Sequence, residues 1–152
     1  MSEPCEICAR IARFTPENPY LIRELETGYA VLGDNQYYPG YTIFLPRTCV
    51  PELHLLLPEI RATFLDEMSI VAEAVFRAFS PAKLNYELLG NSVPHLHWHI
   101  FPRYANDPNP RWPVWSNPAF LQAAQSGTRP DPNELAANCT RLRTELDRLL
   151  AT

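Results

Sequence analysis

The pattern of apolar and polar residues predicts several short strands along the first two thirds of the chain. β-Branched and aromatic residues dominate these runs, and Gly, Pro and Asn separate them. The predicted strands cover residues 20–26, 29–32, 41–45, 84–89 and 95–101. Gly90-Asn91 turns the chain between the last two strands, and Pro102 is the expected end of the last one.

A longer apolar period predicts two helices. Pro58 suits the first position of one helix, and Ser80-Pro81 ends it. Asp131-Pro132 begins a C-terminal helix. The two apolar stripes are Ile60, Phe64, Met68, Val71, Val75 and Phe79, and then Leu135, Cys139, Leu142, Leu146 and Leu149. Strands, a helix and further strands with short links predict an α+β fold, in which an antiparallel sheet carries one main packed helix and the C-terminal helix is added.

The length of 152 residues predicts a single domain over residues 1–152. Its last part, residues 105–152, has a different character. Residues 106–117 are rich in Pro, Asn and Trp and are expected to form a surface loop, and residues 125–129 form a weak linker before the last helix. Trp112 and Trp115 fit a base-stacking role, a dimer contact or packing within the loop, and the sequence leaves these alternatives open.

Composition and charge exclude some function classes. The hydrophobic fraction of 46% and the charged fraction of 20% are typical of a soluble globular protein. The formal charge of -4 does not support binding to a nucleic-acid polymer, although local groups could still bind a small phosphorylated ligand. No apolar run is long enough to span a membrane, and Met1–Pro4 lacks the start of a secretory signal. We therefore expect a cytoplasmic protein.

Three of the four histidines fall within five residues, at His95, His97 and His99. Side chains alternate along a strand, so the three are expected on one face, and the apolar residues between them face the core. Imidazole titrates near neutral pH and can displace a leaving group from phosphorus. That reaction needs donors for the phosphate oxygens, and the turn at residues 90–93 directly before the histidines offers an amide, a hydroxyl and backbone N–H groups.

A metal-dependent hydrolase is the alternative interpretation of the same pattern. Two histidines on one strand face can share a metal ion. Such a site needs a third ligand, and no other histidine or Glu motif is clearly placed to supply it. A third alternative is a nucleotide-binding regulator without useful turnover.

The segment His95-Leu96-His97-Trp98-His99-Ile100-Phe101 resembles the signature of the histidine triad superfamily, His-φ-His-φ-His-φ-φ with φ apolar. Asn35, Pro39-Gly40 and Leu45-Pro46-Arg47 resemble the first nucleotide-contacting region of that superfamily, so the resemblance covers residues 5–104. The wider segment 90–99 is similar to a bacterial branch described as diadenosine polyphosphate hydrolases. The resemblance implies a homodimer with a sheet extended across subunits, and cleavage of a phosphoanhydride or phosphoramidate bond at the α-phosphate of a nucleotide through a nucleotidyl-histidine.

The resemblance also implies roles for single residues. His97 would be the nucleophile, His99 would bind phosphate or assist proton transfer, and Ser92 would place a hydroxyl near the scissile bond. The implied substrate-binding residues are Asn91, Asn35, Asp34, Asn85 and His95. Many members have an acidic ribose contact six positions before the proline of Pro39-Gly40, but this chain has Gly33 there, followed by Asp34.

Cys5-x-x-Cys8 has the ligand spacing of a zinc knuckle. A redox pair is the alternative, but no thioredoxin-like sequence surrounds it. The resemblance implies a closed structural zinc site made by Cys5, Cys8, Cys49 and His95, with no metal required for catalysis. The alternative, found in other members of the superfamily, is a site without metal in which the thiols are simply buried. His54 could replace His95 as a ligand but is the weaker candidate. Cys139 lies on the apolar stripe of the last helix and is expected in the core.

Overall fold

The computed structural model describes residues 4–152 and has one five-stranded antiparallel sheet of order β1-β2-β3-β5-β4. The strands are β1 (Leu21–Glu24), β2 (Gly28–Leu32), β3 (Thr42–Pro46), β4 (Lys83–Glu87) and β5 (Trp98–Arg103). The predicted α+β class is confirmed. Residues 1–3, which carry most of the segment tested for a secretory signal, lie outside the described residues.

The prediction for β5 was wrong at both ends. The strand begins at Trp98 rather than His95 and continues through Pro102 to Arg103. Pro102 is tolerated because β3 pairs with β5 only as far as Ile100, so the missing N–H costs no bond on that side. At the other end His95 leaves the sheet, with its side chain 0% exposed. The three histidines therefore do not share one strand face.

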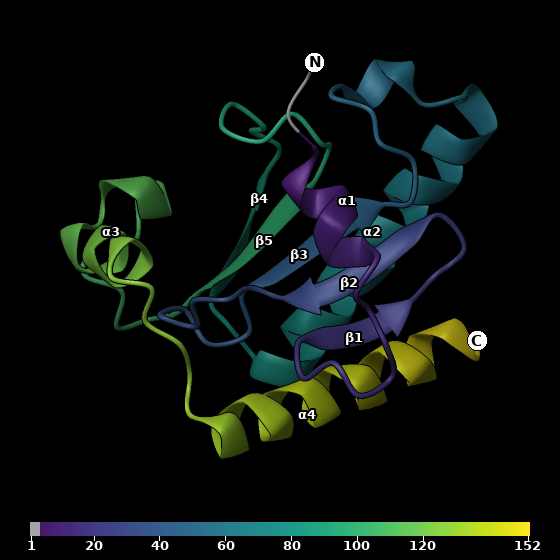
Figure 1. Cartoon of the computed structure of the whole chain (residues 1–152). Helices are drawn as coiled ribbons and strands as arrows, with labels where there is room; N and C mark the ends of the chain where they lie inside the picture. The colour runs from purple at the N-terminus through teal and green to yellow at the C-terminus, as the bar shows by residue number, and fades with distance from the viewer. Residues whose placement is uncertain (1–3) are drawn as a thin grey trace.

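Helix α2 (Pro58–Phe79) covers one face of the sheet, and its predicted bounds are confirmed. Its apolar face buries Phe64, Val71 and Val75 completely. Helix α4 (Pro132–Leu150) packs along α2 and β1 (Figure 1), and Asp131 caps it by accepting hydrogen bonds from two backbone N–H groups. Helix α4 lies on the β1 side of the sheet, and the strand order places β4 at the opposite edge.

The segment between β5 and α4 is more structured than the sequence suggested. It contains the short helix η2 (Val114–Ser116) within the predicted loop, and helix α3 (Pro118–Gln125) between that loop and the predicted linker, where no element was predicted. Asn117 caps α3, and Val114 is completely buried. The expected surface loop therefore contributes Val114 to a second core. The members of this core are Tyr38, Tyr41, Phe101, Val114 and Phe120.

The short helix α1 (Glu6–Ile11) lies in front of the sheet in Figure 1, on the face opposite α2. A single turn, η1 (Leu53–Leu55), precedes α2. Within residues 4–152, no helix is both long and apolar enough to cross a membrane. The arrangement leaves α1, the β4–β5 connection and η2 on the face where the histidines lie.

Candidate functional site

A cavity of about 320 Å³ contains two of the three triad histidines. His97 and His99 line it together with Trp115 from η2. The β4–β5 connection supplies the other lining residues, which are Leu89, Gly90, Asn91, Ser92 and Val93. His95 does not line this cavity. Four predicted site residues therefore meet in one place: His97, His99, Ser92 and Asn91.

The ring of His97 is oriented by the backbone. Its Nδ1 lies 2.6 Å from the carbonyl oxygen of His95. A carbonyl oxygen can only accept, so Nδ1 carries the proton and donates it. In the neutral ring the lone pair is then on Nε2, which is the nitrogen left free to attack.

Tyr41 orients the ring of His99 in the opposite sense. The Tyr41 hydroxyl lies 2.6 Å from Nδ1 of His99 and has no other hydrogen-bond partner among the described residues. Tyr41 is buried, and an unpaired buried donor is costly, so the hydroxyl donates to Nδ1. His99 consequently carries its proton on Nε2. The two rings lie edge to face, with centroids 4.7 Å apart, and present one lone pair and one N–H group.

Burial keeps both His99 and its hydrogen-bond partner Tyr41 neutral. Burial, reinforced by the neighbouring His97, lowers the pKa of His99 to about 4. Burial also raises the pKa of Tyr41 well above its usual value. At pH 7, His99 therefore acts as a hydrogen-bond donor rather than as a cation.

A glycine makes room for Tyr41. The Tyr41 ring fills the space that a Cβ atom on Gly33 would need, and the Gly33 N–H donates to the Tyr41 carbonyl at 2.8 Å. The ring also stacks on Phe101, with centroids 4.0 Å apart. Sequence reasoning treated Tyr41 only as the start of a strand. Its place directly after Pro39-Gly40 and its polar end were the signals that could have identified it.

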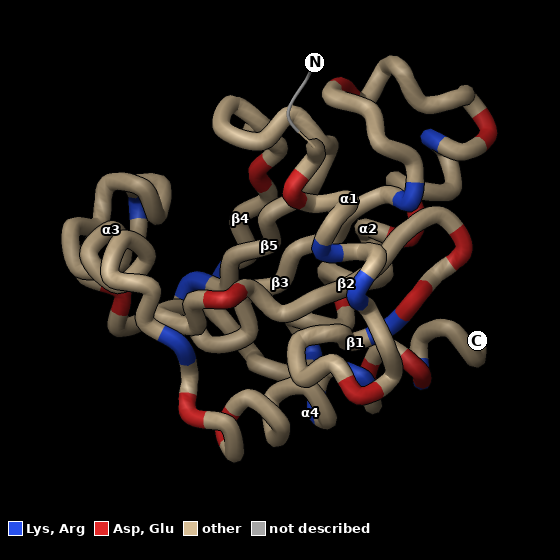
Figure 2. Tube along the Cα trace, in the orientation of Figure 1, with Lys and Arg blue, Asp and Glu red and all other residues tan. Residues whose placement is uncertain are grey.

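Trp115 forms the aromatic wall of the cavity. Its Nε1 donates to the Glu87 carboxylate at 2.5 Å, and its ring lies edge-on to His99, with centroids 5.9 Å apart. Glu87 is the register partner of His99, so the two side chains are cross-strand neighbours. Residues 88–97 carry no Lys, Arg, Asp or Glu (Figure 2). The lining residues therefore offer an anion neutral donors and no arginine or lysine.

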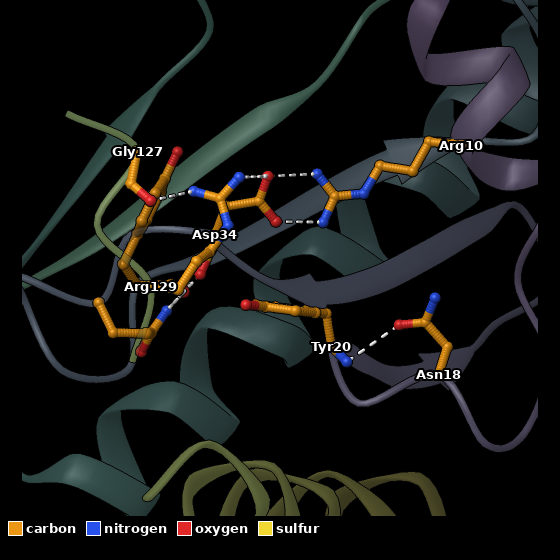
Figure 3. A network of polar contacts seen from close by, with 9 residues as sticks. Arg10, Asn18, Tyr20, Asp34, Gly127 and Arg129 are labelled. Atoms are coloured by element: carbon orange, nitrogen blue, oxygen red, sulfur yellow. Dashed lines mark hydrogen bonds and ion pairs between the residues drawn. The ribbon is translucent and has the colours of Figure 1, made fainter. Parts of the chain in front are cut away.

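Besides His95, three further predicted substrate-binding residues do not line this cavity: Asp34, Asn85 and Asn35. Both carboxylate oxygens of Asp34 bind Arg10, at 2.5 and 3.0 Å, and Arg129 lies 3.7 Å away (Figure 3). The side-chain oxygen of Asn85 accepts from the buried Arg103. Asn35 bonds its own loop, and its Nδ2 is buried without a partner in the part of the chain described. Their roles in binding a nucleotide stay predictions.

A second group of side chains lies on the other side of His95. The sulfur atoms of Cys5, Cys8 and Cys49 and a ring nitrogen of His95 all lie within 4.8 Å of one another. Nδ1 of His95 faces the sulfur atoms of Cys5 and Cys8 at 3.4 and 3.5 Å. Its Nε2 donates to the Pro46 carbonyl at 3.2 Å, which fixes the ring as the backbone fixes a metal-binding histidine.

Three thiols in such a small space favour a cation. Burial, together with the neighbouring thiols of Cys49 and Cys5, raises the pKa of Cys8 to about 12. A bound metal ion replaces the thiol protons and relieves this crowding. The cluster could therefore hold a metal ion, and the His95 carbonyl connects it to the ring of His97.

Comparisons with known proteins agree with this geometry. "Protein hit" of Bacillus subtilis is 31% identical over 108 residues, which are 68% of this chain and 73% of that protein. A histidine triad protein from Marinobacter aquaeolei has a TM-score of 0.75 at 27% identity, covering 95% of this chain and 98% of that one. An asymmetrical bis(5'-nucleosyl)-tetraphosphatase of Schizosaccharomyces pombe is 30% identical over 74 residues, only 45% of this chain and 41% of that enzyme. Since the HIT domain itself matches residues 17–106, more than half of the sequence, the chain belongs to the HIT domain family.

Proposed function

We propose that this chain is a nucleotidyl hydrolase or transferase that cleaves a phosphoanhydride or phosphoramidate bond at the α-phosphate of a nucleotide. The main support is the pair of histidines in one cavity, His97 with Nε2 free for attack and His99 with an Nε2–H group. Displacement at phosphorus needs a nucleophile and a donor for the phosphate oxygens, and this pair supplies both. The relative from S. pombe indicates dinucleoside polyphosphates as one substrate class to test.

The reaction proceeds in two displacements. Nε2 of His97 attacks the α-phosphorus, a P–N bond forms, and the bond to the leaving group breaks. The leaving group takes a proton from water by way of the Ser92 hydroxyl, while the His95 carbonyl stabilises the charge that develops on the ring of His97. Water then attacks the phosphorus, the P–N bond breaks, and the nucleoside monophosphate and a proton leave.

His99 binds phosphate in this scheme and does not donate a proton. Giving up its Nε2 proton would require Nδ1 to take the proton of Tyr41, and burial disfavours the tyrosinate that would result. The Nε2–H group instead donates to a non-bridging oxygen, and Asn91 and the backbone of the β4–β5 connection complete the phosphate site.

The geometry gives little support to a metal-dependent hydrolase. His99 carries its proton on Nε2, and both Nδ1 atoms of His97 and His99 are already bonded, so the two rings do not offer two free lone pairs. Among residues 4–152, the group with metal-ligand geometry is the cysteine cluster around His95. A non-catalytic nucleotide-binding regulator differs from the enzyme only in turnover, so it is an outcome of the experiment below.

The test is release of AMP from diadenosine polyphosphates and from adenosine 5'-phosphoramidate, each with and without a chelator of loosely bound metal. We expect turnover of at least one substrate, unaffected by the chelator, with a transient AMP adduct on the protein detected by intact-mass measurement after acid-free quenching. Binding without turnover would favour the regulator. Turnover abolished by the chelator and restored by a divalent ion would favour the metal hydrolase.

Tyr41→Phe is expected to lower kcat about tenfold or more without a comparable change in KM. The variant keeps the ring packed over Gly33 but removes the donor that holds the proton of His99 on Nε2. Steady-state kinetics with either substrate measures the effect. Tyr38→Phe is a matched control, because its hydroxyl bonds Asn117 rather than a histidine. Equal effects of the two variants would show that Tyr41 contributes packing alone.

We also propose that the cysteine cluster binds structural Zn²⁺. Three thiolates and one imidazole form a closed tetrahedral donor set that suits this ion and leaves no open position for substrate. Zinc would hold α1 against the segment that carries His95, and the carbonyl of His95 orients His97. In this proposal the metal supports the fold of the site, and catalysis requires no metal.

A homodimer through β4 is the third part of the proposal. In the described chain β4 pairs only with β5, so its outer edge is free to continue the sheet. Tyr86 and Phe76 beside this edge are 46% and 48% exposed. We expect sedimentation analysis to give a dimer, and Tyr86→Glu with Phe76→Glu to give a monomer. Leu57→Glu, at a still more exposed apolar residue away from this edge, should leave the dimer intact.

A further inference from the structure

A second and larger cavity, of about 760 Å³, lies where α4 passes the β2–β3 connection. Glu134, Asn138 and Arg141 line it from α4, and their spacing places them on one helix face. Tyr37, Tyr104 and Phe79 contribute aromatic rings from three other segments. We call this space the α4 cavity. It shares no lining residue with the cavity of His97 and His99.

Asn138 is the polar side chain in the middle of the α4 face that lines the cavity. The residue as a whole is 7% exposed, and its amide makes no hydrogen bond to any described residue. Its polar atoms stay open to the cavity, because the fully buried unpaired side-chain atoms among the described residues are those of Asn35 and Trp98. The amide of Asn138 therefore offers one acceptor and two N–H donors to whatever enters the cavity.

Arg141 provides a cation that has no acidic partner among residues 4–152. Its guanidinium lies over the ring of Phe79, 5.6 Å from the centroid. The backbone of Gly40, which has a φ of 87°, packs so closely on that ring that an added Cβ would lie 2.5 Å from it. Phe79 is thereby held in place beneath Arg141. A guanidinium positioned in this way is a ready partner for a carboxylate or a phosphate.

At the end of the cavity away from Arg141, the carboxylate of Glu134 is a hydrogen-bond acceptor. Glu134 makes no ion pair with any described residue, whereas the second acidic group in the lining, Asp107, is bound to Arg103 at 2.6 Å. Glu134 and Arg141 are seven residues apart, which is about 10 Å along the helix axis. The hydroxyl of Tyr104 donates to the Pro39 carbonyl at 2.5 Å, and this bond fixes the aromatic wall between the two ends.

We propose that the α4 cavity binds a planar anion that carries a hydrogen-bond donor at the end opposite its charge. Arg141 binds the anionic group, Asn138 and Glu134 bind the donor edge, and the ring lies against Tyr37 and Tyr104. A nucleoside monophosphate and an amino-substituted aromatic carboxylate share this chemistry, and the length of the site favours the former. The proposal does not depend on the reaction at His97, because the two cavities have no residue in common.

The experiment is calorimetric titration of the full-length chain with AMP and, separately, with 4-aminobenzoate. We expect Arg141→Gln to remove one AMP site per chain or weaken it at least tenfold, and Asn138→Leu to weaken it several-fold. Arg148→Gln is the matched control, since it removes an exposed arginine of the same helix that is paired with Glu145 instead. If AMP also binds at His97, the wild type shows two sites and Arg141→Gln shows one. If AMP does not bind at His97, the wild type shows one site and Arg141→Gln shows none.

The quantity measured is AMP binding that depends on Arg141. It can therefore be interpreted even if the proposed reaction at His97 does not occur. Stronger binding of AMP than of 4-aminobenzoate identifies the nucleotide as the ligand, and the reverse order identifies the aromatic acid. Identical binding of both probes by the wild type and Arg141→Gln, up to millimolar concentration, would overturn the proposal. Because Arg141 is exposed, its substitution is not expected to unfold the chain, and a thermal melt checks this.

Discussion

His97→Ala is expected to lower kcat/KM for AMP release by about 10⁴-fold or more, with the protein still folded. The substitution removes the only ring in the cavity with a free lone pair, since the neighbouring His99 presents an N–H group there. Without a nucleophile the two-step route is lost, and direct attack by water has to replace it. The measurement is release of AMP under single-turnover conditions, with the covalent adduct followed by mass.

His54→Ala is the control for this variant. His54 is the only histidine outside the triad, and it is exposed in η1. We expect its substitution to change the rate by less than about twofold, as is usual for exposed positions without a role. Retention of more than a tenth of the wild-type rate by His97→Ala would exclude the nucleotidyl-histidine route. Loss of adduct with unchanged turnover would indicate that water attacks directly.

Cys8→Ser is expected to remove zinc and to lower the free energy of unfolding by about 4 kcal/mol, with a fall in Tm on the order of 10 °C. The loss of one of four ligands leaves two thiols and a buried imidazole crowded together without their cation. Metal analysis of the purified protein should give near-stoichiometric zinc for the wild type and little for the variant. Calorimetry or a thermal melt then measures the change in stability.

Cys139→Ser separates metal loss from the mere loss of a thiol. Cys139 is buried in the main core, away from the cluster, so this variant should lose some stability and keep its zinc. Wild-type protein without zinc would contradict the structural site directly. The rate of AMP release below the melting transition is also informative. If the metal is purely structural, Cys8→Ser should change this rate only modestly, through the His95 carbonyl that orients His97.

The helices and the sheet followed from local rules. The bounds of α2 coincide with the prediction because Pro58, the apolar period and Ser80-Pro81 all act over a few residues. The start of α4 was predicted for the same reason, and Asp131 caps it as expected. Helix α3 was missed although Asn117-Pro118 is the same kind of start signal, because the surrounding Pro and Trp residues suggested a loop.

The division among the three histidines needed the tertiary structure. Alternation predicted one shared face, but β5 begins only at Trp98, and His95 leaves the sheet toward Cys5 and Cys8. The strand cannot reach His95 because β3 pairs with β5 only from Phe44 to Thr42. The spacing of ligands along a chain does not show where a strand ends, since pairing with another strand decides that.

The sequence by itself determined the α+β class, the main helix, the histidine motif of the candidate site and the identity of the four residues that cluster as potential metal ligands. These depend on residue type, short-range periodicity and resemblance of a motif. Only the tertiary structure decided which ring has a free lone pair, because proton positions on His97 and His99 are set by a carbonyl two residues away and by a hydroxyl 58 residues away. It also decided the role of Tyr41, the wall formed by Trp115 and Glu87, and the α4 cavity, since each joins segments that are far apart in the chain.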